Sequence, residues 1–252
     1  MFSLDVGIRP LASASQNPPD FKEAPMNSEP LADVRDMYMA HTMFRREIGL
    51  ASGLIRGVAA GDRERATVVA EHLELVLVIL DHHHRGEDQH LWPRLVERAG
   101  AASVVQTMES QHSDIDTLVH RLLTGLAGWR AAAGAAEGAE LAEIATLLFE
   151  LLDEHLKIEE QQALPLIEQH VTAAEWGRMV AEGAAGIPPE QIPLIFGLMA
   201  YEGDPETVKE VIATMPPEAG SVIGDLAAQT FAEHAQRVYG TSTPARVGTR
   251  QG

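Results

Sequence analysis

Four long segments of this chain repeat apolar side chains at alternating steps of three and four residues. They run from about residue 30 to 60, from 63 to 99, from Ser103 to Leu122 and from Ile144 to Gln162. This spacing is typical of amphipathic helices whose apolar faces pack together in a bundle. We therefore predict an all-α fold, built on an antiparallel up-down-up-down four-helix bundle with a small helical C-terminal appendage.

The composition of the chain changes along its length and suggests four parts. Residues 1–28 are rich in Pro, Ser and Asn and are expected to form a disordered arm. The bundle is expected over residues 29–171, a helical C-terminal extension over residues 172–240, and a flexible tail over residues 241–252. Inside the bundle, the stretch GWRAAAGAAEGAE (residues 128–140) is expected to be the loop between the third and fourth helices.

Several residues mark the expected ends of helices. Pro93 and Pro165 lie late in the second and fourth segments, where proline interrupts a helix. Thr172 followed by Glu175 has the spacing of a capping box, which opens a helix. Asp204 stands directly before a proline, an arrangement typical of a helix start. The extension is thus expected to consist of short helices.

The charge and the residue types exclude several classes of function. The chain has 37 acidic residues against 19 Lys and Arg, a formal charge of −18, so it would repel nucleic acids and anionic lipid surfaces. It has no cysteine, which excludes disulfides, thiol catalysis, zinc–thiolate sites and iron–sulfur clusters. No apolar run approaches the roughly 18 residues of a membrane span. We expect a cytoplasmic protein with neither nucleic acid nor membrane as a partner, whose metal ligands would be His and carboxylate.

Each of the four helical segments carries one histidine on its apolar face: His41, His83, His112 and His155. Glu87 and Glu159 follow two of these histidines four residues later. Four residues along a helix advance by about 40° net and about 6 Å, so each imidazole and its carboxylate project to the same side. Burying two glutamates without a cation would be costly. The pattern therefore predicts a metal site inside the bundle.

The expected ligands indicate which metals the site would hold. Imidazole and carboxylate ligands without sulfur suit iron or manganese. Six ligands are too many for a single tetrahedral zinc ion, so we expect two metal ions. A ferritin-like arrangement is a second option, because Glu87 precedes His90 and Glu109 precedes His112 at its Glu-x-x-His spacing. It fits less well, because these pairs lie on adjacent helices.

Two stretches carry a family resemblance. DHHHRGEDQHLWPRL from Asp81 and EHLKIEEQQALPLI from Glu154, together with the lone His41 and His112, resemble the hemerythrin-like, HHE cation-binding family over roughly residues 30–170. The stretch after residue 172 is similar to an extension seen on actinobacterial members. The resemblance implies two non-haem iron ions per chain, bridged by an oxo or hydroxo group. Its implied ligands are His41, His83, His112 and His155, with Glu87 and Glu159 as bridging carboxylates.

The chain departs from the oxygen-storage hemerythrins at one expected ligand. Those proteins have a second histidine one turn after the first on the third helix, where this chain has Asp116. Asp116 could fill that position, and His84 and Glu160 are further candidates for metal ligands. Tyr38 and His90 are expected to hydrogen-bond near the site. His72 is expected to pack in the core, and His120, His170 and His234 have no predicted role.

The resemblance implies a protein that binds or reduces a small oxidant: dioxygen, hydrogen peroxide or nitric oxide. A catalase-like, peroxidase-like or nitric-oxide-handling enzyme would fit. So would a module that senses oxygen, redox state or iron, and so would a ferritin-like iron-oxidising protein. The extension could also bind a protein partner or a second copy of the chain.

Overall fold

The computed structural model describes residues 29–247, and within them the chain is helical, as predicted. The helices are α1 (Arg35–Arg56), α2 (Arg63–His90), α3 (Trp92–Ala99), α4 (Ala102–Ala132), α5 (Ala135–Gln162), α6 (Leu164–His170), α7 (Ala173–Ala185), α8 (Ile192–Glu202), α9 (Pro205–Thr214) and α10 (Pro217–Tyr239). The expected N-terminal arm, residues 1–28, lies outside the described residues. In the described part of the chain, no helix is both long and apolar enough to cross a membrane.

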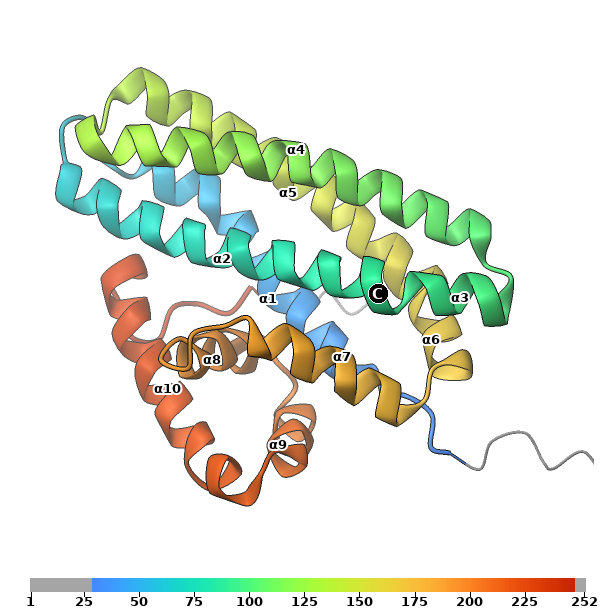
Figure 1. The fold of residues 1–252 in the computed structure, drawn as a ribbon. Coiled ribbons are helices and arrows are strands. Elements are labelled where there is room, and N and C mark those ends of the chain that lie inside the picture. The colour runs from blue at the N-terminus through green and yellow to red at the C-terminus, as the bar shows by residue number, and fades with distance from the viewer. Residues whose placement is uncertain (1–28, 248–252) are drawn as a thin grey trace, which may run out of the picture.

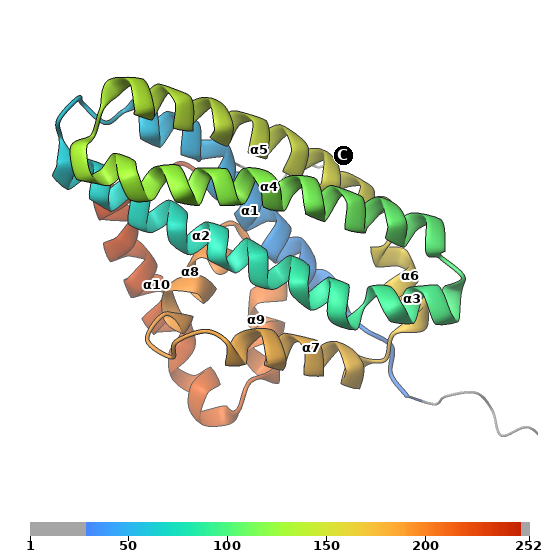
Figure 2. The ribbon, with the colours of Figure 1, turned by 45° about the horizontal axis from the view of Figure 1, so that its top comes forward.

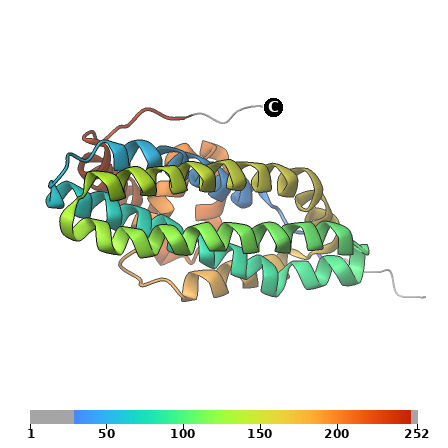
Figure 3. The ribbon, with the colours of Figure 1, turned by 90° about the horizontal axis from the view of Figure 1, so that it is seen from above.

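Four long helices, α1, α2, α4 and α5, lie side by side (Figures 1 and 3). α1 packs against α2 and α5, and α4 packs against the same two helices. Each helix thus has two long neighbours and turns one apolar face toward both of them. The interior between the four helices is where the predicted metal site should lie.

The two interior prolines interrupt the bundle helices as predicted. α2 ends at His90 and α3 continues from Trp92, with Pro93 in the first turn of α3. Pro165 likewise lies in the first turn of α6, directly after α5. The short helices α3 and α6 pack against each other and close one end of the bundle (Figure 1).

Two predicted boundaries are wrong. The first helix runs over Arg35–Arg56, which is shorter than the expected residues 30–60. The expected loop over residues 128–140 is mostly helical, because α4 continues to Ala132 and α5 begins at Ala135. Alanine has the highest helix propensity, so this Ala-rich stretch extends both helices. The chain reverses at Ala133, whose φ of 48° lies in the left-handed region.

The extension, α7 to α10, covers the side of the bundle formed by α1 and α2 (Figures 1 and 2). Its first helix starts at the predicted capping box, in which the side chains of Thr172 and Glu175 each bond the other residue's backbone N–H. Residues 241–247, expected to be part of a flexible tail, lie against α8. The Tyr201 hydroxyl donates to the Pro244 carbonyl, and the backbone N–H of Val247 donates to Glu202.

A buried ionic network also joins the extension to the bundle. Arg46 on α1 contacts Glu47 at 2.5 Å and Glu202 on α8 at 3.0 Å. His72 on α2 lies 3.2 Å from Glu47, which also accepts a hydrogen bond from the Tyr239 hydroxyl. His72 is therefore buried, as expected, but it is hydrogen-bonded rather than packed only against apolar side chains.

The core of the bundle has two apolar parts with polar residues between them. One part includes Phe44, Leu80, Ile115 and Leu152, and the other includes Met37, Leu91, Met108 and Ala163. On each of the four long helices, the His and Glu residues expected as metal ligands stand between these two parts in sequence, whereas Glu47 and His72 belong to the separate ionic network. The polar cluster is therefore enclosed by apolar side chains at both ends.

Candidate metal centre

The structure brings the six expected ligands together in the interior of the bundle and adds a seventh residue, His84. They form two groups of four that share one residue, and in each group the potential ligand atoms lie within 4.8 Å of one another. The first group is His41, His83, Glu87 and Glu159, and the second is His84, Glu87, His112 and His155. The shared residue, Glu87, is 1% exposed.

Glu87 faces both groups, one carboxylate oxygen toward each. Its Oε1 lies 3.0 Å from Nε2 of His83 in the first group. Its Oε2 lies 3.4 Å from Nε2 of His112 in the second group. A carboxylate held in this way is positioned to bridge two cations.

Glu159 also lies between the groups. Its Oε2 is 3.3 Å from Nε2 of His41 and 3.7 Å from Nε2 of His155. It is fully buried, as its 40° offset from His155 on the helix suggests. Two carboxylates therefore separate the two sets of imidazoles.

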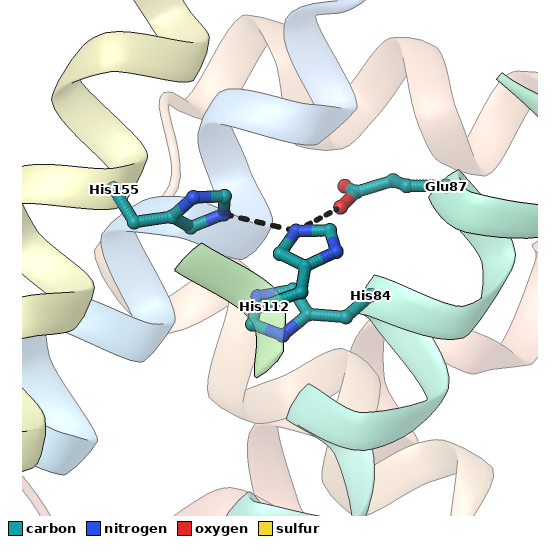
Figure 4. Close-up of side chains that lie close together, drawn as sticks. All are labelled: His84, Glu87, His112 and His155. Atoms are coloured by element: carbon teal, nitrogen blue, oxygen red, sulfur yellow. Dashed lines mark hydrogen bonds and ion pairs between the residues drawn. The ribbon is translucent and has the colours of Figure 1, made fainter. Parts of the chain in front are cut away.

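The second group is drawn in Figure 4. The rings of His84 and His112 stack, with centroids 4.0 Å apart and an angle of 13° between their planes. The Nε2 atoms of His112 and His155 lie 3.2 Å apart. Three imidazoles from three helices thus converge on the side of Glu87 that carries Oε2.

Neighbouring side chains orient three of the imidazoles through their Nδ1 atoms. His41 Nδ1 lies 2.9 Å from Glu160, His112 Nδ1 lies 2.9 Å from Asp88, and His155 Nδ1 lies 3.1 Å from Oε1 of Gln111. Because these oxygens accept, the ring proton of each neutral imidazole is assigned to Nδ1. Each Nε2 then turns a lone pair toward the cluster, as in metal-binding histidines.

The residues fit a pair of metal cations by a second criterion. Buried polar atoms in folded proteins almost always have hydrogen-bond partners. In this cluster, Nε2 of His41, His83 and His84 has no partner, and neither do the carboxylate oxygens of Glu87 and Glu159. Within each group these atoms lie close together, so one cation in each group would satisfy them.

Burial and neighbouring charges shift the pKa values of the cluster in both directions. Burial acts to lower the pKa of His41, but the adjacent Glu159 and Glu160 outweigh it and raise that pKa. Burial and the neighbouring imidazoles lower the pKa of His83 to about 3, and burial is also the main cause that lowers the pKa of His155 to about 3. Burial and the adjacent charge of Glu159 raise the pKa of Glu87 well above its usual value. Burial acts to raise the pKa of Glu159 too, but His41 and the other imidazoles outweigh it and hold that pKa at about 2. Neutral imidazoles are the form that binds metal.

Four other candidates lie outside the cluster. Glu160 is not among the grouped atoms and instead pairs with His41 Nδ1 and Arg45. Tyr38 is 43% exposed. His90 pairs with Glu182 on α7, 3.0 Å away. Asp116 is exposed on α4.

The position of Asp116 has a simple cause. The buried face of α4 steps by three residues from His112 to Ile115, which is fully buried. The residue four positions after His112 is therefore turned away from the bundle interior. Of the two candidates, His84 on α2 and not Asp116 joins the second group of potential ligands.

Consecutive histidines are the signal that points to His84. Adjacent residues on a helix are about 100° apart, and α2 has two long neighbours. His83 faces α1, where its ring lies 5.4 Å from that of His41, and His84 faces α4, where it stacks on His112. No sequence pattern points to Asp88 or Gln111 as orienting residues, because the histidines that they contact lie on other helices.

A search against protein-family models matched the hemerythrin HHE cation-binding domain over residues 32–167, more than half of the chain. Comparisons with curated proteins and with solved structures gave no significant match. The matched range contains both groups of the cluster and ends before the extension. The sequence-based assignment is thus confirmed, and the chain belongs to the hemerythrin HHE cation-binding domain family.

Proposed function

We propose that this protein is a non-haem di-iron protein that binds or reduces a small oxidant: dioxygen, hydrogen peroxide or nitric oxide. The observation that carries the proposal is the division of seven potential ligands, six of them buried, into two groups that share Glu87. Imidazole and carboxylate ligands without sulfur favour iron or manganese among the common metals. The proposed framework is the up-down-up-down four-helix bundle of the family.

The ligand count supports two ions rather than one. A single octahedral ion takes six ligands, whereas the cluster offers five imidazoles and two carboxylates that lie between them. Two irons in such a site would supply one-electron redox chemistry toward an oxidant. The low pKa values of His83 and His155 keep these two imidazoles neutral, and Glu87 keeps a carboxylate between the two positions.

The surroundings of the cluster support a small oxidant as its ligand. Apolar side chains such as Phe44, Ile115 and Met108 enclose it from both ends. This shell would limit the access of bulk water to bound metals and favour small, weakly hydrated molecules over ions. The orienting partners Glu160, Asp88 and Gln111 hold the ligands in place, and changes in their hydrogen bonds would alter the redox potential.

Reconstitution of the full-length protein with ferrous ion, without oxygen, tests this proposal. We expect about two irons per chain. We then expect the near-ultraviolet absorption to change on addition of at least one of dioxygen, hydrogen peroxide or nitric oxide. An oxygen electrode, read after peroxide is added, distinguishes decomposition of peroxide from binding alone.

Variants make the test specific to the cluster. Either His83→Ala or Glu159→Ala is expected to abolish the absorption change, because each removes a potential ligand from the first group. His120→Ala, at an exposed position on α4, is expected to leave it unchanged. A protein that takes up no ferrous ion, or that holds two irons and responds to none of the three oxidants, would contradict the proposal.

A further inference from the structure

A cavity of about 300 Å³ lies between the bundle and the extension. Residues of α1 and α2 form one wall, and residues of α7, α8 and α9 form the opposite wall. The cavity therefore exists only because the extension covers this side of the bundle. It is an additional site that adjoins the interior cluster of ligands.

The inner end of the cavity reaches the candidate metal centre. His83 and Glu87, both members of the first group, contribute to its lining. Phe44 lines it as well, and its ring centroid lies 5.1 Å from that of His83. A molecule in the cavity would lie directly beside these two ligands.

Apolar side chains make up most of the wall. Five methionines contribute, from both the bundle and the extension: Met37, Met43, Met179, Met199 and Met215. Methionine is unbranched and polarizable, so a wall of this kind adapts to apolar molecules of different shape. The cavity therefore suits a hydrophobic ligand rather than one that needs many hydrogen bonds.

Two glycines help to keep the cavity open. A Cβ atom added at Gly183 on α7 would meet no atom within 4 Å, and one added at Gly86 on α2 would meet only Met179, at 3.9 Å. Glycine inside a helix costs roughly 1 kcal/mol relative to alanine. Both glycines line the cavity, so larger side chains at these positions would reduce its volume.

The charges around the cavity disfavour an anionic ligand. Its titratable lining residues are Asp36, His82, His83 and Glu87, without a lysine or arginine. Arg35, which lines an adjoining cavity, is already paired with Asp33 and Glu210. A carboxylate or phosphate group would therefore find no unpaired cation there.

We propose that this cavity binds a neutral, apolar organic molecule whose inner end lies beside His83 and Glu87. Its volume is at the lower end of the range for ligand sites, which is about 300–1,000 Å³. It is also about twice that of an engineered cavity of roughly 150 Å³ that holds benzene. The ligand is therefore larger than a single benzene ring, of the size of a two-ring aromatic or a medium-chain alcohol.

Fluorescence of N-phenyl-1-naphthylamine, a neutral probe in which an amine joins a naphthalene to a phenyl ring, tests the proposal on the full-length protein. We expect saturable enhancement with about one probe per chain. We expect 1-decanol to displace the probe and decanoate, its anionic counterpart, to displace it at least ten-fold less effectively. Binding is read without reference to metal, so its failure is distinguishable from a failure of iron uptake.

Matched glycine variants locate the probe. Gly183→Phe is expected to weaken binding at least ten-fold, and Gly183→Leu, which fills less space, is expected to weaken it less. Gly128→Phe is the control, because Gly128 is exposed on α4, away from the cavity, and a Cβ there also meets nothing within 4 Å. Cooperative thermal unfolding checks that each variant is folded. Absence of saturable enhancement, equal displacement by decanoate, or wild-type binding by both folded Gly183 variants would overturn the proposal.

Discussion

The Nε2 atoms of His112 and His155 lie 3.2 Å apart, yet neither carries a proton to share when both rings are neutral. The ring proton of each is engaged at Nδ1, with Asp88 in one case and Gln111 in the other. Two lone pairs at this distance, with a Glu87 oxygen 3.4 Å from His112, repel one another. A cation between these atoms would be attracted to all of them and would replace the repulsion, so bound metal should contribute to the stability of the fold.

Removal of metal is accordingly expected to lower the thermal midpoint of unfolding. A ligand present at 1,000 times its dissociation constant stabilises the folded state by about 4 kcal/mol. For a chain of this size, that corresponds to a midpoint shift of roughly 10 °C. Calorimetry of the metal-loaded protein, before and after chelation, measures the shift, and returning the metal should restore it. An unchanged midpoint after complete chelation would contradict the expected coupling.

His84→Ala is expected to reduce the metal content from about two ions per chain to about one. His84 belongs only to the second group, so its loss weakens that position and leaves the first group complete. Metal analysis of the purified variant by plasma emission gives the count. His82→Ala, two residues earlier and outside both groups, and Asp116→Ala, on the exposed side of α4, are the controls. Loss of one metal in the Asp116 variant, with both kept in the His84 variant, would reverse the assignment.

Spacing within a single helix is the part of the site that the sequence predicts well. Glu87 and Glu159 follow their histidines at a helical interval, and both lie in the cluster. The same reasoning predicts the all-helical fold, the proline breaks and the capping box at Thr172, because each depends only on residues close together in the chain. The division into an arm, a bundle, an extension and a tail stays a prediction.

Contacts between helices are what the sequence does not predict. The rotation of α2 decides that His84 points to His112, and the side chains across the interface decide that Asp88 and Gln111 orient the imidazoles. His234, for which no role is predicted from sequence, lies 3.0 Å from His72, although 162 residues separate them. Such pairs depend on how the extension packs against the bundle, which no local pattern encodes.

Glu160→Gln is expected to weaken metal binding without changing the number of ions. Glu160 accepts from Nδ1 of His41 and is paired with Arg45, so it positions a ligand without touching the metal. Loss of such an orienting partner typically costs 10–100-fold in metal affinity. Competition with a chromophoric chelator measures the affinity. Glu159→Gln is the comparison, and it should bind fewer ions. Equal behaviour of the two variants would show that the positions of Glu159 and Glu160 are not functionally distinct.

Arg46→Ala is expected to destabilise the protein by about 3–5 kcal/mol, because it leaves buried carboxylates without their cation. Arg46 is 1% exposed and contacts both Glu47 and Glu202. Urea unfolding measures the loss. The control is Arg56→Ala, whose exposed pair with Glu143 is worth less than about 1 kcal/mol. Similar losses of unfolding free energy in the two variants would mean that the buried network does not stabilise the packing of the extension against the bundle.

His234 is expected to make the folded protein less stable at acidic pH. Its burial and the adjacent His72 lower the pKa of His234 to about 4 in the folded state, against about 6.5 in an unfolded chain. Between these two values the unfolded chain binds a proton that the folded protein does not. The free energy of unfolding therefore falls as the pH is lowered from about 6.5 toward 4.

His234→Gln removes this contribution. When urea unfolding is measured from pH 8 to pH 4.5, the free energy of unfolding should decline less steeply for the variant. The difference between the two slopes should correspond to at most one bound proton per chain. The difference between variant and wild type at pH 8 measures the loss of the contact with His72, and only the change in that difference with pH reports on protonation. A difference that stays constant across the range would mean that His234 binds its proton equally well in the folded and unfolded chains.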